Sequence, residues 1–202
     1  METTHLAGYT LALHICGKLF QDAPSEIFLA RSHEQNLFSE WPLPPASEEA
    51  AAALDALQRA FQTGPGDAEA VRQDAFALFS GPAPIARPWE SVWREGENIL
   101  FGEQTMLVRQ TYAQWGLVSE TRGREPEDHL ALELAFCVHL LHRIAQDDRN
   151  AGAALADFLD SHLLRWAEPC LRKASENATE VLYRALTLLC LDALHSLRKD
   201  LY

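Results

Sequence analysis

Apolar residues recur three and four positions apart along almost the whole chain, and β-branched residues are sparse. This period matches one buried face of an α-helix, whereas a half-buried strand would alternate apolar and polar residues. No segment of the sequence predicts a β-strand. The sequence therefore predicts an all-α fold, and 202 residues are enough for one domain to bury its core without disulfides or metal.

Capping residues and helix breakers place the individual helices. Three polar residues are predicted N-caps: Ser25, Ser47 and Asp67. The segments expected to be helical cover about residues 6–20, 25–38, 47–62, 67–79 and 103–116. Pro126 is expected to begin a long helix, because proline suits the first helical position. Residues 151–202 predict two or three more helices, broken at Pro169 and near Asn177.

The charge of the chain limits its partners. It carries 17 basic and 29 acidic residues, a formal net charge of −12. Such a charge repels nucleic-acid phosphates and anionic lipid but attracts a cationic peptide. We therefore expect a neutral or basic partner and no binding of nucleic acid.

The cysteines and the apolar segments indicate a compartment. Four cysteines are scattered with no close pair, as expected for reduced thiols in the cytoplasm: Cys16, Cys137, Cys170 and Cys190. Residues 1–5 include an acid where an export signal would be basic, so we expect no such signal. Residues 185–194 form the most apolar tail segment, but they contain Asp192 and are too short to cross a bilayer, so no integral membrane segment is expected.

Residues 81–98, which we call the tryptophan loop, lose the helical period. Prolines at positions 82, 84 and 88 exclude a continuous helix. Four apolar residues persist between and after them: Ile85, Trp89, Val92 and Trp93. Loops without apolar anchors are usually mobile, and two tryptophans rarely stay exposed without a use. The combination predicts an ordered, functional loop.

Four short segments in and around this loop carry a resemblance to a known family. They are LFSGP at 78–82, PWESVW at 88–93, LFGEQT at 100–105 and EPEDH at 125–129. In this order and spacing they resemble the TorD/DmsD family of cytoplasmic redox-enzyme maturation chaperones. The resemblance implies a single domain over residues 1–202, with that family's helical fold of about ten helices. It also implies that the chain is not an enzyme. We expect no catalytic residue, no metal and no cofactor, and any nucleotide or pterin binding that the family implies rests on the resemblance alone.

The resemblance implies two main partners. They are a twin-arginine (Tat) signal peptide and the apo catalytic subunit of a molybdoenzyme of the dimethyl sulfoxide or trimethylamine N-oxide reductase type. The chaperone would assist maturation and delay export until the client holds its molybdenum cofactor. The Tat translocon and the molybdenum-cofactor biosynthesis proteins are further partners that the family implies. The sequence is compatible with either a monomer or a homodimer.

The same resemblance places the signal-peptide-binding residues in and beside the tryptophan loop. They are Leu78, Phe79, Gly81, Pro82, Pro88, Trp89, Trp93, Phe101, Gly102, Glu125, Pro126, Asp128 and His129. The large apolar members are expected to form a rigid wall for the hydrophobic stretch of the peptide. Gly81 and Gly102 are expected to permit close backbone approach or a positive φ. Asp128, at a helix N-terminus, either binds an arginine of the peptide or locks the loop by hydrogen bonds to backbone, and the sequence leaves both roles open.

Five acids flank the loop: Glu95, Glu97, Glu125, Glu127 and Asp128. Exposed charge pairs contribute only about 0.2 to 1 kcal/mol each, whereas apolar burial contributes about 25 cal/mol per Å². We therefore expect burial to supply the affinity for the signal peptide and the acids to supply its orientation.

The sequence departs from the family pattern at three places. Glu90 stands where family members tend to have glycine. The segment 81–88 is one residue shorter than the corresponding segment of the family. An aromatic residue that usually precedes the Leu-Phe pair is shifted to Phe76. We therefore expect the preferred signal peptide to differ from that of a dimethyl sulfoxide reductase.

Two other functions stay open. A nitrate-reductase-type assembly chaperone would recognise a client that is never exported, through an N-terminus without paired arginines. A small helical metal-dependent or hydrolytic enzyme would use His129 and Glu133. The chain has no H-E-x-x-H or C-x-x-C motif, and the other candidate pairs on this helix diverge around its cylinder, which disfavours a metal site.

Overall fold

The computed structural model describes residues 3–96, 99–119 and 125–202, and within these ranges the fold is all-α, as predicted. Its α-helices are α1 (Thr3–Gln21), α2 (Glu26–Glu34), α3 (Glu48–Thr63), α4 (Ala68–Ala75), α5 (Glu90–Arg94), α6 (Glu103–Gln114), α7 (Leu130–Ala145), α8 (Ala151–Ser161), α9 (Ala167–Asn177) and α10 (Val181–Asp200). Three shorter helical turns are Leu37–Glu40, Phe76–Ser80 and Leu163–Arg165. No strand occurs in the described ranges, where the one β-type pairing is an isolated bridge.

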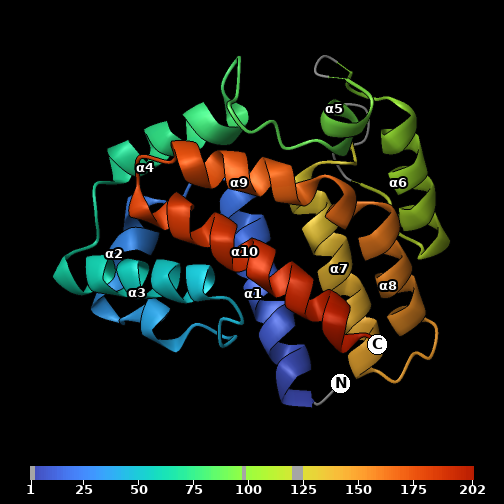
Figure 1. The fold of residues 1–202 in the computed structure, drawn as a ribbon, viewed down its shortest axis with the longest axis horizontal. Coiled ribbons are helices and arrows are strands. Elements are labelled where there is room, and N and C mark those ends of the chain that lie inside the picture. Colours follow the sequence, from blue (N-terminus) through green and yellow to red (C-terminus); the bar gives the residue numbers. More distant parts are fainter. Residues whose placement is uncertain (1–2, 97–98, 120–124) are drawn as a thin grey trace.

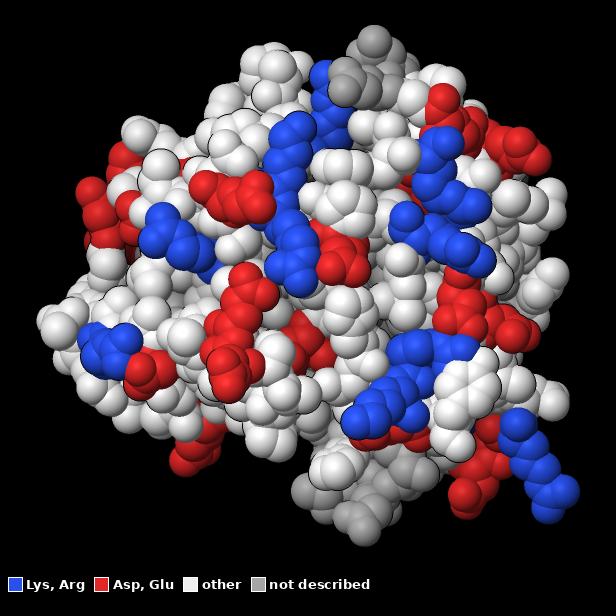
Figure 2. Space-filling view, in the orientation of Figure 1, with Lys and Arg blue, Asp and Glu red and all other residues white. Residues whose placement is uncertain are grey.

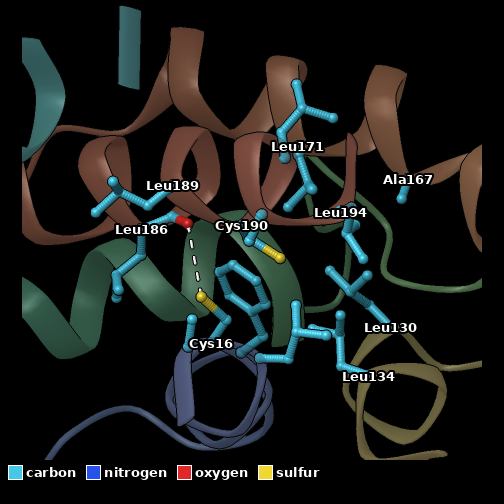
Figure 3. Packing of buried hydrophobic residues seen from close by; sticks show 14 of the residues in the cluster. Cys16, Leu130, Leu134, Ala167, Leu171, Leu186, Leu189, Cys190 and Leu194 are labelled. Atoms are coloured by element: carbon cyan, nitrogen blue, oxygen red, sulfur yellow. Dashed lines mark hydrogen bonds between the residues drawn. The ribbon is translucent and has the colours of Figure 1, made fainter. Parts of the chain in front are cut away.

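The core is built around α1, α7 and α10. Helix α1 packs along α7, and α10 crosses α1 while also packing against α3 and α9 (Figure 1). The largest fully buried side chains include Trp166, Tyr183 and Phe158. Cys16 of α1 and Cys190 of α10 lie among leucines between these helices (Figure 3). All four cysteines are free and buried, in agreement with the predicted thiols.

The predicted caps of three helices are confirmed. The Ser25 side chain accepts the amide of Phe28 at 3.2 Å, and Ser47 accepts that of Ala50 at 3.2 Å. Asp67 accepts the amides of Glu69 at 2.9 Å and Ala70 at 3.3 Å. These side chains satisfy donors that have no partner inside the helix, so short local signals in the sequence fix where α2, α3 and α4 begin.

Two predicted boundaries were wrong. The long helix α7 begins at Leu130, four residues after Pro126, because His129 caps it. Helix α2 ends at Glu34 rather than near Phe38, since Asn36 has a left-handed φ of 49° before a 3₁₀ turn follows.

The predicted helix break at Pro169 was wrong. This residue lies in the first turn of α9, where the missing amide proton costs no helical hydrogen bond. The break lies earlier, at the turn Leu163–Arg165. The predicted break near Asn177 is confirmed, because α9 ends there.

No helix in the described ranges is long and apolar enough to span a membrane. The single domain over 1–202 stays a prediction, although the buried apolar residues from α1 through α10 belong to one cluster.

Gly8 provides a test of the packing of α1. A β-carbon there would lie 2.7 Å from the carbonyl oxygen of Pro42 and 2.8 Å from a methyl of Leu43. We expect Gly8→Ala to lower the free energy of unfolding by about 1 to 3 kcal/mol, because overpacking outweighs the helix propensity of alanine. Gly152→Ala is the control, since no atom lies within 4 Å of its β-carbon. Urea unfolding in which both variants match the wild type would contradict this account.

Candidate functional site

The tryptophan loop contains a helix, α5, that the sequence did not predict. Its N-cap residue, Trp89, is extended and gives no side-chain cap. Asp128 caps it instead from 37 residues away, as its Oδ2 accepts the amide of Ser91 at 2.8 Å. The expectation of a non-helical loop was therefore wrong for Glu90–Arg94, because five residues are too few to show a helical period and their cap is remote in sequence.

The loop is joined through its backbone to the segment before α7. Trp89 and His129 form an isolated antiparallel bridge, and the amide of Glu90 donates to the carbonyl of Asp128 at 3.0 Å. The rings of Trp89 and His129 meet edge to face, with centroids 5.7 Å apart. Two of the segments that carry the family resemblance thus lie side by side.

Asp128 joins the loop to α6 as well. Its Oδ1 accepts the hydroxyl of Thr105 at 2.7 Å, while Oδ2 is held by Ser91. The carboxylate is fully buried. Of the two roles that the sequence left open for Asp128, the structure has it locking the loop.

His129 is a buried N-cap. Its Nδ1 accepts the amide of Ala131 at 3.1 Å, which starts α7. Burial lowers the pKa of His129 from 6.5 to about 4, because the charged imidazole would lose its hydration. The ring is therefore neutral at pH 7 and acts as a hydrogen-bond acceptor.

Two of the flanking acids are occupied inside the protein. Glu127 is buried and forms a two-point pair with Arg109, at 2.8 and 2.7 Å. Glu95 caps α6 by accepting the amides of Glu103 at 3.1 Å and Gln104 at 2.7 Å.

Glu125 is the acid placed best to meet a partner. It is only partly buried, and its Oε1 accepts the indole N–H of Trp89 at 2.9 Å. Glu97 lies outside the described residues. The acids that the structure describes thus mainly hold the loop in shape, and little of their charge is left for orienting a peptide.

Glu90, which departs from the family pattern, lies at the centre of a buried ionic cluster. It is fully buried, pairs with Arg94 one turn along α5, and lies 2.8 Å from Nδ1 of His162. Arg94 also donates to the carbonyl of Ser161 at 2.9 Å. The cluster fastens α5 to the end of α8. Sequence reasoning missed it, although the spacing of Glu90 and Arg94 is a signal of a helical ion pair.

A second buried acid, Glu133, lies behind this cluster. Its Oε2 accepts the indole N–H of Trp166 at 3.3 Å, and Oε1 has no hydrogen-bond partner among the described residues. Burial first, and then the neighbouring carboxylates of Glu90 and Asp128, raises the pKa of Glu133 well above its ordinary value. Glu133 therefore belongs to the protein interior and does not form part of a surface site.

The predicted site residues divide between core and surface. The buried members are Leu78, Phe79, Pro88, Pro126, Asp128 and His129. The partly or fully exposed members are Gly81, Pro82, Trp89, Trp93, Phe101, Gly102 and Glu125. Phe79 packs against Phe20 and Tyr183 in the core, so the Leu-Phe pair supports the loop rather than lining its outer surface.

An exposed apolar strip adjoins the loop. It consists of Ile99, Leu100, Phe101, Met106 and Leu107, each 40 to 48% exposed. Only Phe101 was predicted as a site residue. Met106 and Leu107 were missed because their spacing is that of a helix core, and only the packing of α6 shows which of its faces meets solvent. Ile99 and Leu100 precede α6, where no helical period separates exposed from buried residues.

Trp93 lines a separate hollow of about 320 Å³, together with Pro84, Ile85 and Lys173 among others. Its indole donates to the carbonyl of Arg87 at 2.7 Å, and the ammonium of Lys173 lies 5.8 Å from the ring centroid. The two tryptophans therefore do not form one continuous wall. Trp89 faces Glu125 and His129, whereas Trp93 faces α9.

Both predicted glycines allow a close approach and neither has a positive φ. A β-carbon at Gly81 would lie 2.9 Å from the carbonyl oxygen of Phe76. One at Gly102 would clash with the Glu95 carboxylate that caps α6. The left-handed residue here is Phe101, with φ 58°.

No group of three or more histidine, cysteine, aspartate or glutamate side chains suited to a metal occurs within 3–96, 99–119 and 125–202. Figure 2 shows acidic and basic side chains intermingled on the face formed by α9 and α10. What distinguishes the candidate site is therefore a braced loop with exposed apolar side chains beside it.

An all-helical fold with such a loop is the architecture expected of the maturation-chaperone class. Residues 43–172, more than half of the chain, match the family described as nitrate reductase delta subunit. The chain belongs to this family, within which it is similar to the TorD/DmsD chaperones, and it is a chaperone rather than an enzyme.

Individual relatives agree with this placement. The chain is 29% identical over 180 residues to the Tat proofreading chaperone DmsD of Salmonella typhimurium, which covers 88% of this chain and 83% of that protein. It is 32% identical over 126 residues to the "Probable Tat proofreading chaperone DmsD" of Haemophilus influenzae, covering 62% of this chain and 59% of that one. It is 32% identical over 111 residues to the chaperone protein TorD of Vibrio cholerae, covering 52% and 50%.

The bracing role of Asp128 can be tested by truncation. We expect Asp128→Ala to lower the free energy of unfolding by about 3 kcal/mol, because it leaves a buried amide and a buried hydroxyl without acceptors. Asp148→Ala, which removes a surface carboxylate paired with Arg143, is the control and should cost much less, because surface ion pairs contribute little to stability. Hydrogen exchange should also speed up in α5 of the first variant. Unchanged exchange there would show that Asp128 does not brace the loop.

Stability should depend on pH through His129. In the unfolded chain His129 is protonated below about pH 6.5, whereas in the folded protein it stays neutral down to about pH 4. The free energy of unfolding therefore decreases as the pH falls from 6.5 toward 4. Relative to His129→Asn, which keeps a capping acceptor, the wild type should lose about 2 kcal/mol between pH 7 and pH 5. Urea unfolding at both pH values measures the difference. Parallel losses in the two proteins would contradict the buried neutral ring.

Proposed function

We propose that the chain is a cytoplasmic chaperone that binds the N-terminal signal peptide of a molybdoenzyme at the tryptophan loop and the apolar strip. The observation that carries the proposal is the exposed apolar strip beside a loop whose acidic side chains Glu90 and Glu95 are already engaged inside the protein. A rigid apolar surface binds with little loss of conformational entropy. The hydrophobic stretch of a signal peptide supplies the complementary surface.

Apolar burial should dominate this binding because the nearby acids are engaged. Glu127 and Glu95 have internal partners, and Asp128 is fully buried. Among the flanking acids that the structure describes, Glu125 is the one for which a peptide arginine could compete, since it is partly exposed and bound to Trp89. The net charge of −12 would still attract a cationic peptide at long range and make association faster at low salt.

The proposed client is an exported molybdoenzyme of the dimethyl sulfoxide or trimethylamine N-oxide reductase type. The names of the DmsD and TorD relatives support it. Holding the signal peptide while the apo catalytic subunit acquires its cofactor would prevent premature export. The Tat translocon and the molybdenum-cofactor biosynthesis proteins would then be downstream partners.

A second candidate is assembly of a nitrate-reductase-type client that is not exported. The family description, nitrate reductase delta subunit, favours it. The two candidates differ in whether paired arginines matter. Replacing Arg-Arg by Lys-Lys in the test peptide should weaken binding in the first case and leave it unchanged in the second.

Calorimetric titration with a twin-arginine signal peptide of a molybdoenzyme tests the division between apolar and charged contacts. We expect a Kd of roughly micromolar and a loss of about tenfold or more in Leu107→Ser, because the side chain is a partly exposed anchor. Glu125→Gln should lose less, about fivefold at most. Leu37→Ser, a comparably exposed residue outside the strip, should bind like the wild type.

Two outcomes would contradict the proposal. Equal losses in Leu107→Ser and Leu37→Ser would place the peptide elsewhere. A larger loss in Glu125→Gln than in Leu107→Ser would mean that charge, and not burial, supplies the affinity.

A further inference from the structure

A second apolar surface runs along the seam between α1 and α7. A groove of about 470 Å³ is lined by Leu6, Ala7, Thr10, Leu11 and His14 of α1 and by Val138, His142 and Ala145 of α7. Its lining is almost entirely apolar, and Leu11 is 50% exposed in it. Exposed apolar side chains gathered in one hollow of this kind mark interaction surfaces.

The groove continues toward the start of α7. A smaller hollow of about 120 Å³ shares His14 with it and is lined further along by Gly17, Lys18 and Gln21 of α1 and by Ala131, Leu132 and Ala135 of α7. From residue 6 to residue 21 of α1 the distance is about 22 Å, at 1.5 Å per residue. This length matches a docked helix of about four turns.

The charge of this seam is opposite to that of the chain as a whole. Helix α1 contains no acidic residue, and the single carboxylate of α7, Glu133, is fully buried. Lys18 has no carboxylate within ion-pair distance among the described residues, and the two exposed imidazoles, His14 and His142, can donate hydrogen bonds. Arg143, at the end of α7, is paired with Asp148. A protein of net charge −12 thus carries a helix seam without exposed carboxylates.

We propose that this seam is a second docking surface, which takes an amphipathic helix of a partner polypeptide whose apolar stripe is flanked by carboxylates. Apolar side chains spaced by three and four residues would fill the groove, as in other helix-in-groove complexes. Aspartate or glutamate beside the stripe would meet Lys18 and the imidazoles at the rim. A second copy of this chain would bring the same carboxylate-free seam and leave Lys18 without a partner.

The occupant also differs from a signal peptide. A twin-arginine signal joins a basic start to an apolar stretch, whereas this seam favours acidic flanks. The larger groove lies toward the end of α7, since Val138 to Ala145 are eight to fifteen residues beyond Leu130, about 12 to 22 Å along the helix. The smaller hollow reaches Ala131 at the start of α7. Because no residue that lines either hollow belongs to the tryptophan loop or the apolar strip, we expect both surfaces to be occupied at once.

Fluorescence anisotropy with three labelled synthetic peptides tests the proposal. All are about five turns long and carry leucine at helical spacing. One has glutamate flanks, one has lysine flanks and one has a central proline. We expect the glutamate peptide to bind the full chain at least about tenfold more tightly than the other two, because it alone combines a helix with complementary charge. Excess twin-arginine peptide should not displace it.

Three variants locate the binding. Leu11→Asp should weaken it about tenfold or more, whereas Ile27→Asp, a 67% exposed residue of α2, should not. Lys18→Glu should narrow the preference for glutamate over lysine flanks without loss of apolar surface, so its effect does not depend on folding defects. Circular dichroism checks that each variant is folded.

The proposal is overturned if the glutamate peptide does not bind, if both charged peptides bind equally, or if Leu11→Asp and Ile27→Asp behave alike. Displacement by the twin-arginine peptide would show one shared site rather than two. Sedimentation velocity that finds a dimer abolished by Leu11→Asp would identify a second copy as the occupant, and would also overturn it.

Discussion

The geometry of the candidate site depends on one buried carboxylate. Asp128 accepts a backbone amide from the first turn of α5 and a hydroxyl from α6, and its own carbonyl accepts the amide of Glu90. Three segments that are far apart in the sequence meet at this side chain. Because a buried acceptor without donors is costly, the native arrangement is strongly preferred over loosened alternatives. These contacts hold residues 89–96 of the tryptophan loop in place, although its prolines prevent a continuous helix.

The chemistry under the loop explains why its surface is apolar. Glu90, Glu127 and Glu95 are each engaged by a cation or by backbone amides, and His129 is held neutral. Because these side chains already have partners inside the protein, they are not available to form ion pairs with a bound peptide. What is left at the surface is the edge of Trp89 and the side chains of the apolar strip. Recognition through such a surface is tolerant of sequence, as suits a target defined by hydrophobicity more than by particular residues.

Local signals in the sequence predicted much of the fold. The caps at Ser25, Ser47 and Asp67 act within three residues, and the buried stripe of α1 follows its period, so both could be read directly. Helix α5 could not, because its cap comes from Asp128. The start of α7 was misplaced because histidine is an uncommon cap and Pro126 gave a stronger signal.

The candidate site was predicted by resemblance more than by pattern. The loop and its tryptophans stand out in any sequence reading, but the division of the site residues into core and surface depends on long-range packing. Phe79 and Phe101 are alike in the sequence, yet one is buried against Tyr183 and the other is 44% exposed. The contact between Glu90 and His162 joins residues 72 apart, and no local rule predicts it.

Helix α7 begins beside the tryptophan loop and ends in the groove along α1. The same helix therefore supports both the tryptophan loop and the groove. The loop and the apolar strip, in contrast, belong to a continuous stretch between α4 and α7. This stretch also contributes Phe79, Val108 and Tyr112 to the core. Its exposed side chains can therefore vary without rebuilding the core only while these three buried residues stay in place.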